Sequence, residues 1–232
     1  MFTDKEIAVV DRLLTTTRTV RRRLDVTRPV DVATVKECLR LATYAPSGSN
    51  LQTWRWIVVT DPEVRAQIGE YYRAAFETDR GAETFATYRT ANADAFAGSD
   101  PQATARMMLS VSALNDRISE VPVLVVACST TTLEDSASPF LRSTVLGSVF
   151  PAMWSFQLAL RSRELASAFT TAHLVYEREV GQLLGIPEGV TQVGMIAVAH
   201  FVGDYFQAPT RRPIEEITYS NRWSDVATTQ GL

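Results

Sequence analysis

The sequence predicts an α+β fold in which helices and strands pack in layers. Three short apolar runs, at residues 54–59, 122–128 and 193–201, are typical of buried strands. Between them lie segments whose apolar residues recur at helical spacing, but the two kinds of element do not alternate strictly. Strict alternation marks a parallel α/β fold, so its absence favours an α+β architecture.

The N-terminal part of the chain predicts two helices and a polar loop. Apolar residues recur at helical spacing over residues 7–14, which predicts a helix that ends near Thr17. A second helix follows Asp31, whose carboxylate suits an N-cap, and Pro46 ends it. Residues 46–53, with the sequence PSGSNLQT, form a loop that leads directly into the first strand.

The middle of the chain adds two predicted helices, separated by a segment that leaves the core. The helices cover about residues 62–76 and 101–119. The stretch from 77 to 100 is polar and poorly periodic, and Gly81 and Gly98 interrupt it. It is interpreted as an excursion from the core or a flap. Ser129 to Pro139 is interpreted as a polar loop.

The last third of the chain predicts one unusual helix and an extended tail. Residues 145–161 are apolar nearly all round, so the helix must be covered on every side, and a second subunit would provide that cover. A strand at 165–171 and a helix at 176–184 come next. The tail, 203–232, contains prolines and no hydrophobic period up to Trp223 and is expected to be extended. We expect one domain over residues 1–232.

Composition excludes several classes of function. The chain has 23 basic and 26 acidic residues, a net charge of −3, which argues against a nucleic-acid partner. The N-terminus does not resemble a signal peptide, and no apolar run is long enough to cross a bilayer, so we expect no membrane partner and a cytoplasmic location. With only His173 and His200, no metal site is expected, and Cys38 and Cys128 are interpreted as buried free thiols.

Three polar segments have a composition that suits ligand binding. Four arginines fall between residues 18 and 23, either as a solvated turn or as a phosphate-binding group, because guanidinium matches phosphate oxygens. Arg211 and Arg212 could add cationic donors from the far end of the chain. The loop at 46–53 carries amides and hydroxyls that suit the polar edge of a heteroaromatic ring.

The order of these segments resembles the FMN-dependent nitroreductase family. The matching motifs are R-T-V-R at 18–21, A-P-S-G-x-N-x-Q-x-W-R at 45–55, SVFPA at 148–152, FTTAH at 169–173, LLGIPE at 183–188 and RRPIEE at 211–216. This resemblance implies a nitroreductase-like fold, with a mainly antiparallel central sheet flanked by helices. It also implies an intertwined homodimer with an extended C-terminal tail.

The resemblance implies a tightly bound FMN and assigns residues to it. Arg18, Thr19 and Arg21 correspond to the phosphate and ribityl contacts, and Arg211 to a second phosphate contact that Arg212 could replace. The other implied contacts, to the isoalloxazine ring or close beside it, are Pro46, Ser47, Asn50, Gln52, Thr170 and Thr171. No catalytic side chain is implied, because the flavin N5 carries the chemistry.

The implied reaction is a ping-pong transfer of hydride from NAD(P)H, as co-substrate, through the flavin to a small electron-poor acceptor. Nitroaromatics, quinones and activated alkenes all fit. Two alternatives remain open: a specialised flavoenzyme of the same fold, such as a biosynthetic dehydrogenase or reductive dehalogenase, and a non-catalytic flavin- or deazaflavin-binding protein. Thr53, Glu164 and Ala166 depart from the family's proline and two glycines. His173 is interpreted as a structural residue, with a proton-donor role as the alternative.

Overall fold

A computed structural model describes residues 1–223, so the predicted tail is described only as far as Trp223. The chain divides into two compact units. One covers residues 17–204, and the other combines residues 1–16 with the chain from 205 onward. The larger unit contains the sheet and the segments that precede and follow its strands.

The larger unit is built on a five-stranded antiparallel sheet with the order β1-β5-β3-β2, in which β4 also pairs with β5. This confirms the predicted mainly antiparallel sheet. The strand β1 is only two residues long and was not predicted from the sequence. The strands are β1 (Leu24–Asp25), β2 (Trp54–Val59), β3 (Val123–Ser129), β4 (Ala166–Thr170) and β5 (Thr191–Phe201).

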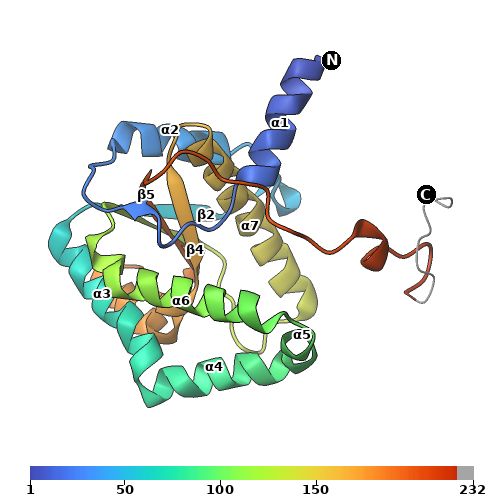
Figure 1. The fold of residues 1–232 in the computed structure, drawn as a ribbon. Helices are drawn as coiled ribbons and strands as arrows, with labels where there is room; N and C mark the ends of the chain where they lie inside the picture. The colour runs from blue at the N-terminus through green and yellow to red at the C-terminus, as the bar shows by residue number, and fades with distance from the viewer. Residues whose placement is uncertain (224–232) are drawn as a thin grey trace. The chain divides into compact units, whose positions relative to one another are not determined.

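Helices cover both faces of this sheet. In Figure 1, α2 and α7 lie on one side, while α3 and α6 cross the other. The core beneath α2 and α7 includes Val35, Cys38, Val149 and Phe156, together with alternate residues of β3. The helices of the larger unit are α2 (Val32–Ala42), α3 (Pro62–Glu77), α4 (Asp79–Ala91), α5 (Ala93–Ala97), α6 (Pro101–Arg117), α7 (Pro139–Arg161) and α8 (Glu177–Leu184).

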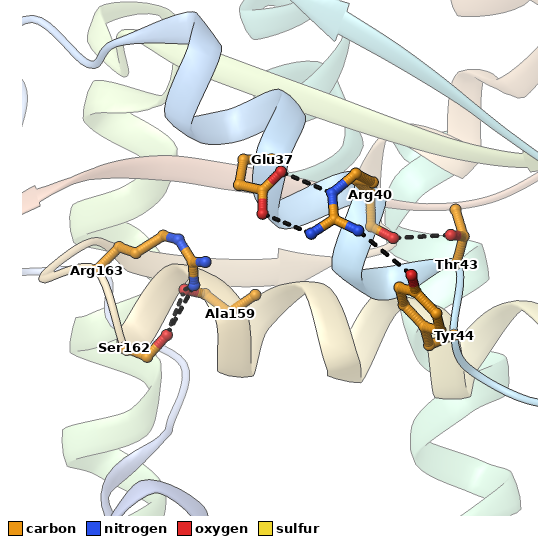
Figure 2. A network of polar contacts seen from close by, with 7 residues as sticks. All are labelled: Glu37, Arg40, Thr43, Tyr44, Ala159, Ser162 and Arg163. Atoms are coloured by element: carbon orange, nitrogen blue, oxygen red, sulfur yellow. Dashed lines mark hydrogen bonds and ion pairs between the residues drawn. The ribbon is translucent and has the colours of Figure 1, made fainter.

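The contact between α2 and α7 depends on apolar burial rather than on surface charge. Figure 2 shows Arg40 of α2 bonded to both carboxylate oxygens of Glu37 at 2.8 Å, and Arg163, just beyond α7, bonded to the Ala159 carbonyl at 3.2 Å. Neither interaction joins α2 to α7, and an exposed ion pair such as that of Arg40 with Glu37 contributes at most about 1 kcal/mol. Full burial of Val35 and Phe156 accounts for more, because each such apolar side chain contributes roughly 1.5–3 kcal/mol.

The segment from 77 to 100 is helical, forming α4 and α5. Its weak periodicity has a physical reason: most of its residues are exposed, so these helices need no continuous apolar stripe. Gly81 does not interrupt the helix. A Cβ atom at this position would collide with the backbone of Ala75, so glycine permits the close approach of α3 and α4.

The helix predicted at 145–161 begins earlier, at Pro139. Ser138 caps it by accepting a hydrogen bond from the Leu141 amide at 3.2 Å, and Pro139 stands in the first turn, where its missing N–H costs nothing. In this chain its apolar circumference is only partly covered. Phe150 and Trp154 remain about 40% exposed, at 41% and 40%.

The smaller unit contains α1 (Asp4–Thr16), which confirms the first predicted helix, and the described part of the tail. No residue of α1 is buried. The tail up to Trp223 has one 3-10 turn, η4 (Ile214–Glu216), and otherwise no helix or extended strand.

Candidate functional site

Several of the predicted site residues lie at the same end of the sheet, where strands β2 and β5 begin and strands β3 and β4 finish. Strand β2 begins there at Trp54, which pairs with Ser129 at the end of β3. Strand β4 finishes at the same end, because Thr170 pairs with Met195 near the beginning of β5. The loop at 46–53 precedes β2, and Thr171 follows β4, so both of these segments lie at this end of the sheet.

The arginine-rich segment runs along the outer side of β4. Thr19 forms a parallel bridge with Ser167, and the Val20 amide donates to the Ser167 carbonyl at 2.8 Å. Arg21 follows this bridge directly, and the Leu24 amide then donates to the Arg21 carbonyl at 3.3 Å in a turn that leads into β1, where Leu24 pairs with Phe201. Arg21 also interacts electrostatically with Tyr72, the hydrogen-bond partner of Thr170, so Arg21 and Thr170 lie in the same region.

Tyr72 of α3 connects these two residues. Thr170 donates a hydrogen bond from its hydroxyl to the Tyr72 hydroxyl at 3.2 Å, and the Tyr72 ring is buried. Burial raises the pKa of Tyr72, an effect opposed by the Thr170 hydrogen bond and by the Arg21 charge. In the sequence, Tyr72 belongs to the group of aromatic residues next to the 77–100 segment, which suits a lid or an anchor for it. Its place in the buried stripe with Ile68 and Ala75 is the sequence signal for a hydroxyl that needs a partner.

Arg21 is the most informative cation of the site. It is half-buried, and burial lowers the pKa of its guanidinium, a shift that the nearby Tyr72 opposes. Among residues 1–223, no carboxylate forms an ion pair with it. A partly desolvated charge without a counter-charge is costly, so this position favours an anionic ligand. Its neighbours Arg18 and Thr19 are exposed.

The loop at 46–53 has a strained backbone. Ser49, Asn50 and Gln52 all have positive φ values, of 51°, 54° and 50°. Left-handed backbone costs a non-glycine residue roughly 1–2 kcal/mol and clusters at functional sites. Local hydrogen bonds support it: the Gln52 backbone amide donates to the Ser47 hydroxyl at 3.1 Å, and the Gln52 side-chain amide donates to Oδ1 of the Asn50 side chain at 3.1 Å.

The structure brings the predicted residues together in three separate groups. In the first group, Tyr72 is bonded to Thr170 and interacts electrostatically with Arg21, and Thr19 lies on the same segment as Arg21. The second group, which is the loop before β2, is separated from β4 by β3 and β5, a distance of roughly 14 Å at about 4.8 Å per strand. The third group, Arg211 and Arg212, is exposed in the smaller unit.

Two of the departures from the family pattern have local explanations. Thr53 stands where the family has proline, and its hydroxyl accepts a hydrogen bond at 3.1 Å from the fully buried Ser129. Glu164 stands where the family has glycine, and its φ of 58° lies in the left-handed region that glycine favours. Glu164 precedes β4, at the end of the strand opposite Thr170, so its position indicates a turn role.

His173 is completely buried in the turn η3 (Ala172–Tyr176). Neither ring nitrogen has a hydrogen-bond partner in the described part of the chain, and burial lowers the pKa to about 4. A neutral, enclosed imidazole suits a packing role better than proton donation near neutral pH.

The region of the chain that the structure describes offers few other sites. Within residues 1–223, no three His, Cys, Asp or Glu side chains gather closely enough to hold a metal ion. No helix in the same range combines the length and apolarity required to cross a membrane.

The antiparallel sheet and its flanking helices define a nitroreductase-like fold. A variant of an FMN- and NADPH-dependent nitroreductase from Sphigopyxis sp. strain HMH superimposes with a TM-score of 0.63 at 21% identity, over 91% of this chain and 98% of that one. An iodotyrosine deiodinase bound to FMN and 3-iodo-L-tyrosine superimposes with a TM-score of 0.60 at 22% identity, over 86% and 94% of the two chains.

The family model named Nitroreductase family matches residues 14–200, so the chain belongs to the nitroreductase family. In sequence, the chain is 44% identical over 72 residues to a nitrobenzene nitroreductase of Ectopseudomonas oleovorans. That match spans 29% of this chain and 30% of the relative.

Proposed function

We propose that this protein is an FMN-dependent oxidoreductase that transfers hydride from NAD(P)H to a small electron-poor acceptor. The observation that carries the proposal is the half-buried Arg21, which has no ion pair among residues 1–223 and lies near Tyr72 and Thr170 in a nitroreductase-family chain. A phosphate monoester supplies the anion that this guanidinium lacks, and arginine binds phosphate with strong charge-assisted hydrogen bonds.

The remaining residues fit the rest of an FMN molecule. Arg18 and Thr19 are exposed on the segment beside β4 and are free to contact the phosphate and ribityl chain. Thr170 and Thr171 follow the buried part of β4 and fit the edge of a flavin ring. Arg211 and Arg212 of the smaller unit are proposed as further phosphate contacts.

Bound FMN would supply a ring that accepts a hydride and passes it to a second substrate. The protein residues bind and orient that ring. Pro46, Ser47, Asn50 and Gln52 present a polar, conformationally restricted surface to it, and fixed donors of this kind need little reorganisation during a reaction. No side chain is required as a nucleophile.

A homodimer is part of the proposal. The loop before β2 is roughly 14 Å from β4 within one chain, by the strand spacing. A second subunit could bring its own loop to the Arg21 region. The exposed Phe150 and Trp154 on α7 provide apolar surface for such an interface.

Nitroaromatic compounds are the proposed acceptors. The nitroreductase of Ectopseudomonas oleovorans, identical at 44% of the positions in the matched segment, acts on nitrobenzene according to its name. Quinones and activated alkenes belong in the same test because they also accept a hydride.

The test is a flavin titration followed by anaerobic reduction. We expect one FMN per chain, reduction by NADH or NADPH, and reoxidation by nitrobenzene. A protein that fails to quench FMN fluorescence overturns the proposal. Bound flavin that neither nicotinamide reduces would support a flavin-binding protein instead, and turnover of one metabolite alone would support a specialised flavoenzyme.

A further inference from the structure

The loop before β2 is attached to α7 at one residue. The Gly48 amide donates a hydrogen bond to the Ser148 hydroxyl at 2.9 Å. The same hydroxyl donates to the Thr144 carbonyl, one turn earlier in the helix, at 2.7 Å. Ser148 is 5% exposed, so water competes little for this contact.

Glycine is required at the point of attachment. A Cβ atom on Gly48 would lie 2.8 Å from the Thr144 Cγ2 methyl, which is closer than a real contact allows. This methyl cannot move easily, because Thr144 is β-branched and its hydroxyl is bonded to the Phe140 carbonyl at 2.8 Å. The backbone of the loop therefore approaches α7 as closely as the helix surface permits.

The strain of the loop makes this attachment necessary. Ser49, Asn50 and Gln52 adopt left-handed backbone, which persists only where surrounding contacts impose it. Two of the supporting hydrogen bonds join loop residues to one another, and so they cannot fix the loop to the fold. The bond from Gly48 to Ser148 joins the loop to a long, packed helix.

We propose that Ser148 and Thr144 are positioning residues, which hold the loop at 46–53 in the geometry that binds the flavin ring. The inference rests on the proposed function. Neither side chain has to touch the ligand. Ser148 fixes the loop through the Gly48 amide, and Thr144 fixes the distance between that glycine and α7.

The first experiment compares S148A with S143A. Ser143 is an exposed neighbour on the same helix and has no hydrogen bond in the described structure, so it is a matched control. For S148A we expect the affinities for FMN and riboflavin to fall equally, by roughly 2- to 12-fold, as for the loss of one hydrogen bond. We also expect a shift of the bound flavin's absorption band, which reports on the surroundings of the ring. S143A should change neither.

The second experiment tests the close approach and does not depend on S148A folding well. G48A should weaken the binding of both flavins, and adding T144S should restore much of it, because serine lacks the methyl that the new Cβ atom at position 48 would meet while keeping the hydroxyl. Wild-type affinity in both S148A and G48A, or a loss confined to FMN, overturns the inference. If the wild-type protein binds neither flavin, the proposed function fails and the inference fails with it. If the wild type binds both flavins but S148A and G48A both keep wild-type affinity, only the inference fails.

Discussion

The two parts of the candidate site are built in different ways. Around Tyr72, the site is formed by buried side chains of α3 and β4 that meet through tertiary packing, with Arg21 half-buried beside them. The loop before β2 is mostly exposed, carries positive φ at three non-glycine residues and is attached to α7 through Ser148. The Tyr72 region provides the partly desolvated positive charge of Arg21, and the loop provides a backbone of fixed geometry.

This difference determines how each part should fail. A buried cation with no counter-ion loses ligand affinity when its charge is removed, whereas a strained loop loses affinity when its geometry relaxes. Variants at the two parts should therefore be separable by ligand: FMN and riboflavin share the ring, but only FMN carries the phosphate.

The largest effect is expected for R21A. Loss of a charge-assisted hydrogen bond to phosphate costs roughly 1.5–3 kcal/mol, so FMN affinity should fall about 10- to 200-fold. Riboflavin affinity should be nearly unchanged. The matched control is R22A, because Arg22 is the exposed neighbour on the same segment. Equal FMN affinity in R21A and the wild type, measured by fluorescence quenching, would show that Arg21 does not bind the phosphate. The proposed contrast between a charged region and a strained loop would then be wrong.

Acid should lower the free energy of unfolding through His173, which is buried in the packed part of the protein. Burial lowers the pKa of His173 to about 4 from an ordinary value of 6.5, so the unfolded chain takes up the proton first as the pH falls. Stability is therefore complete above about pH 6.5 and declines toward pH 4. By linkage, unfolding should become easier by about 2 kcal/mol between about pH 7.5 and pH 5.

The measurement for His173 is urea unfolding at both pH values. H173L should remove most of the pH dependence, because leucine does not titrate and needs no hydrogen bonds. H200Q is the comparison variant, since His200 is only partly buried and should contribute less. An unchanged pH dependence in H173L would show that other groups cause the acid sensitivity.

The sequence predicted the packed elements better than the loop. An apolar run located β3 almost to the residue, because a strand buried on both faces must be apolar throughout. β2 is only partly buried, and its aromatic and β-branched residues located it. The short β1 was not found because two residues carry no periodicity. The helices α4 and α5 were missed as helices because they are mostly exposed, so their sequence needs no apolar stripe.

The site residues also differ in how well the sequence predicts them. Arginine composition and the motif at 45–55 identified Arg21 and the loop, but Tyr72 needed the structure, because only the fold brings α3 to Thr170. The strain at Ser49 and Gln52 was also unpredictable, since neither serine nor glutamine favours left-handed backbone. Motifs therefore located the ligand-binding residues, and tertiary contacts revealed the residues that position them.

A smaller effect is expected for Y72F, which tests whether the Tyr72 hydroxyl contributes to the region around Arg21. Phenylalanine keeps the buried ring and removes the hydroxyl that accepts from Thr170, so the net loss should be about 0.5–1.5 kcal/mol in stability. FMN affinity should fall by up to about 12-fold. Y71F is the control, because the Tyr71 ring packs against Tyr176 without a hydroxyl contact in the described structure. If Y71F and Y72F behave alike in calorimetry and FMN titration, the Tyr72 hydroxyl is not part of this site.

The smallest effect is expected for E164G, which tests whether left-handed backbone outside the loop is only a local cost. Glu164 is exposed and has a φ of 58°, and it lies at the end of β4 remote from Thr170. Glycine relieves the strain but adds freedom to the unfolded chain, so the net gain should be about 0.5–1 kcal/mol, or roughly 1–4 °C in Tm for a chain of this size. E164A removes the same charge and keeps the strain, so it should not gain stability.

FMN and riboflavin affinities should be the same in E164G and E164A. A gain in E164A equal to that in E164G would assign the effect to charge, and a change in flavin binding would place Glu164 within the site's influence despite its position at the far end of the strand.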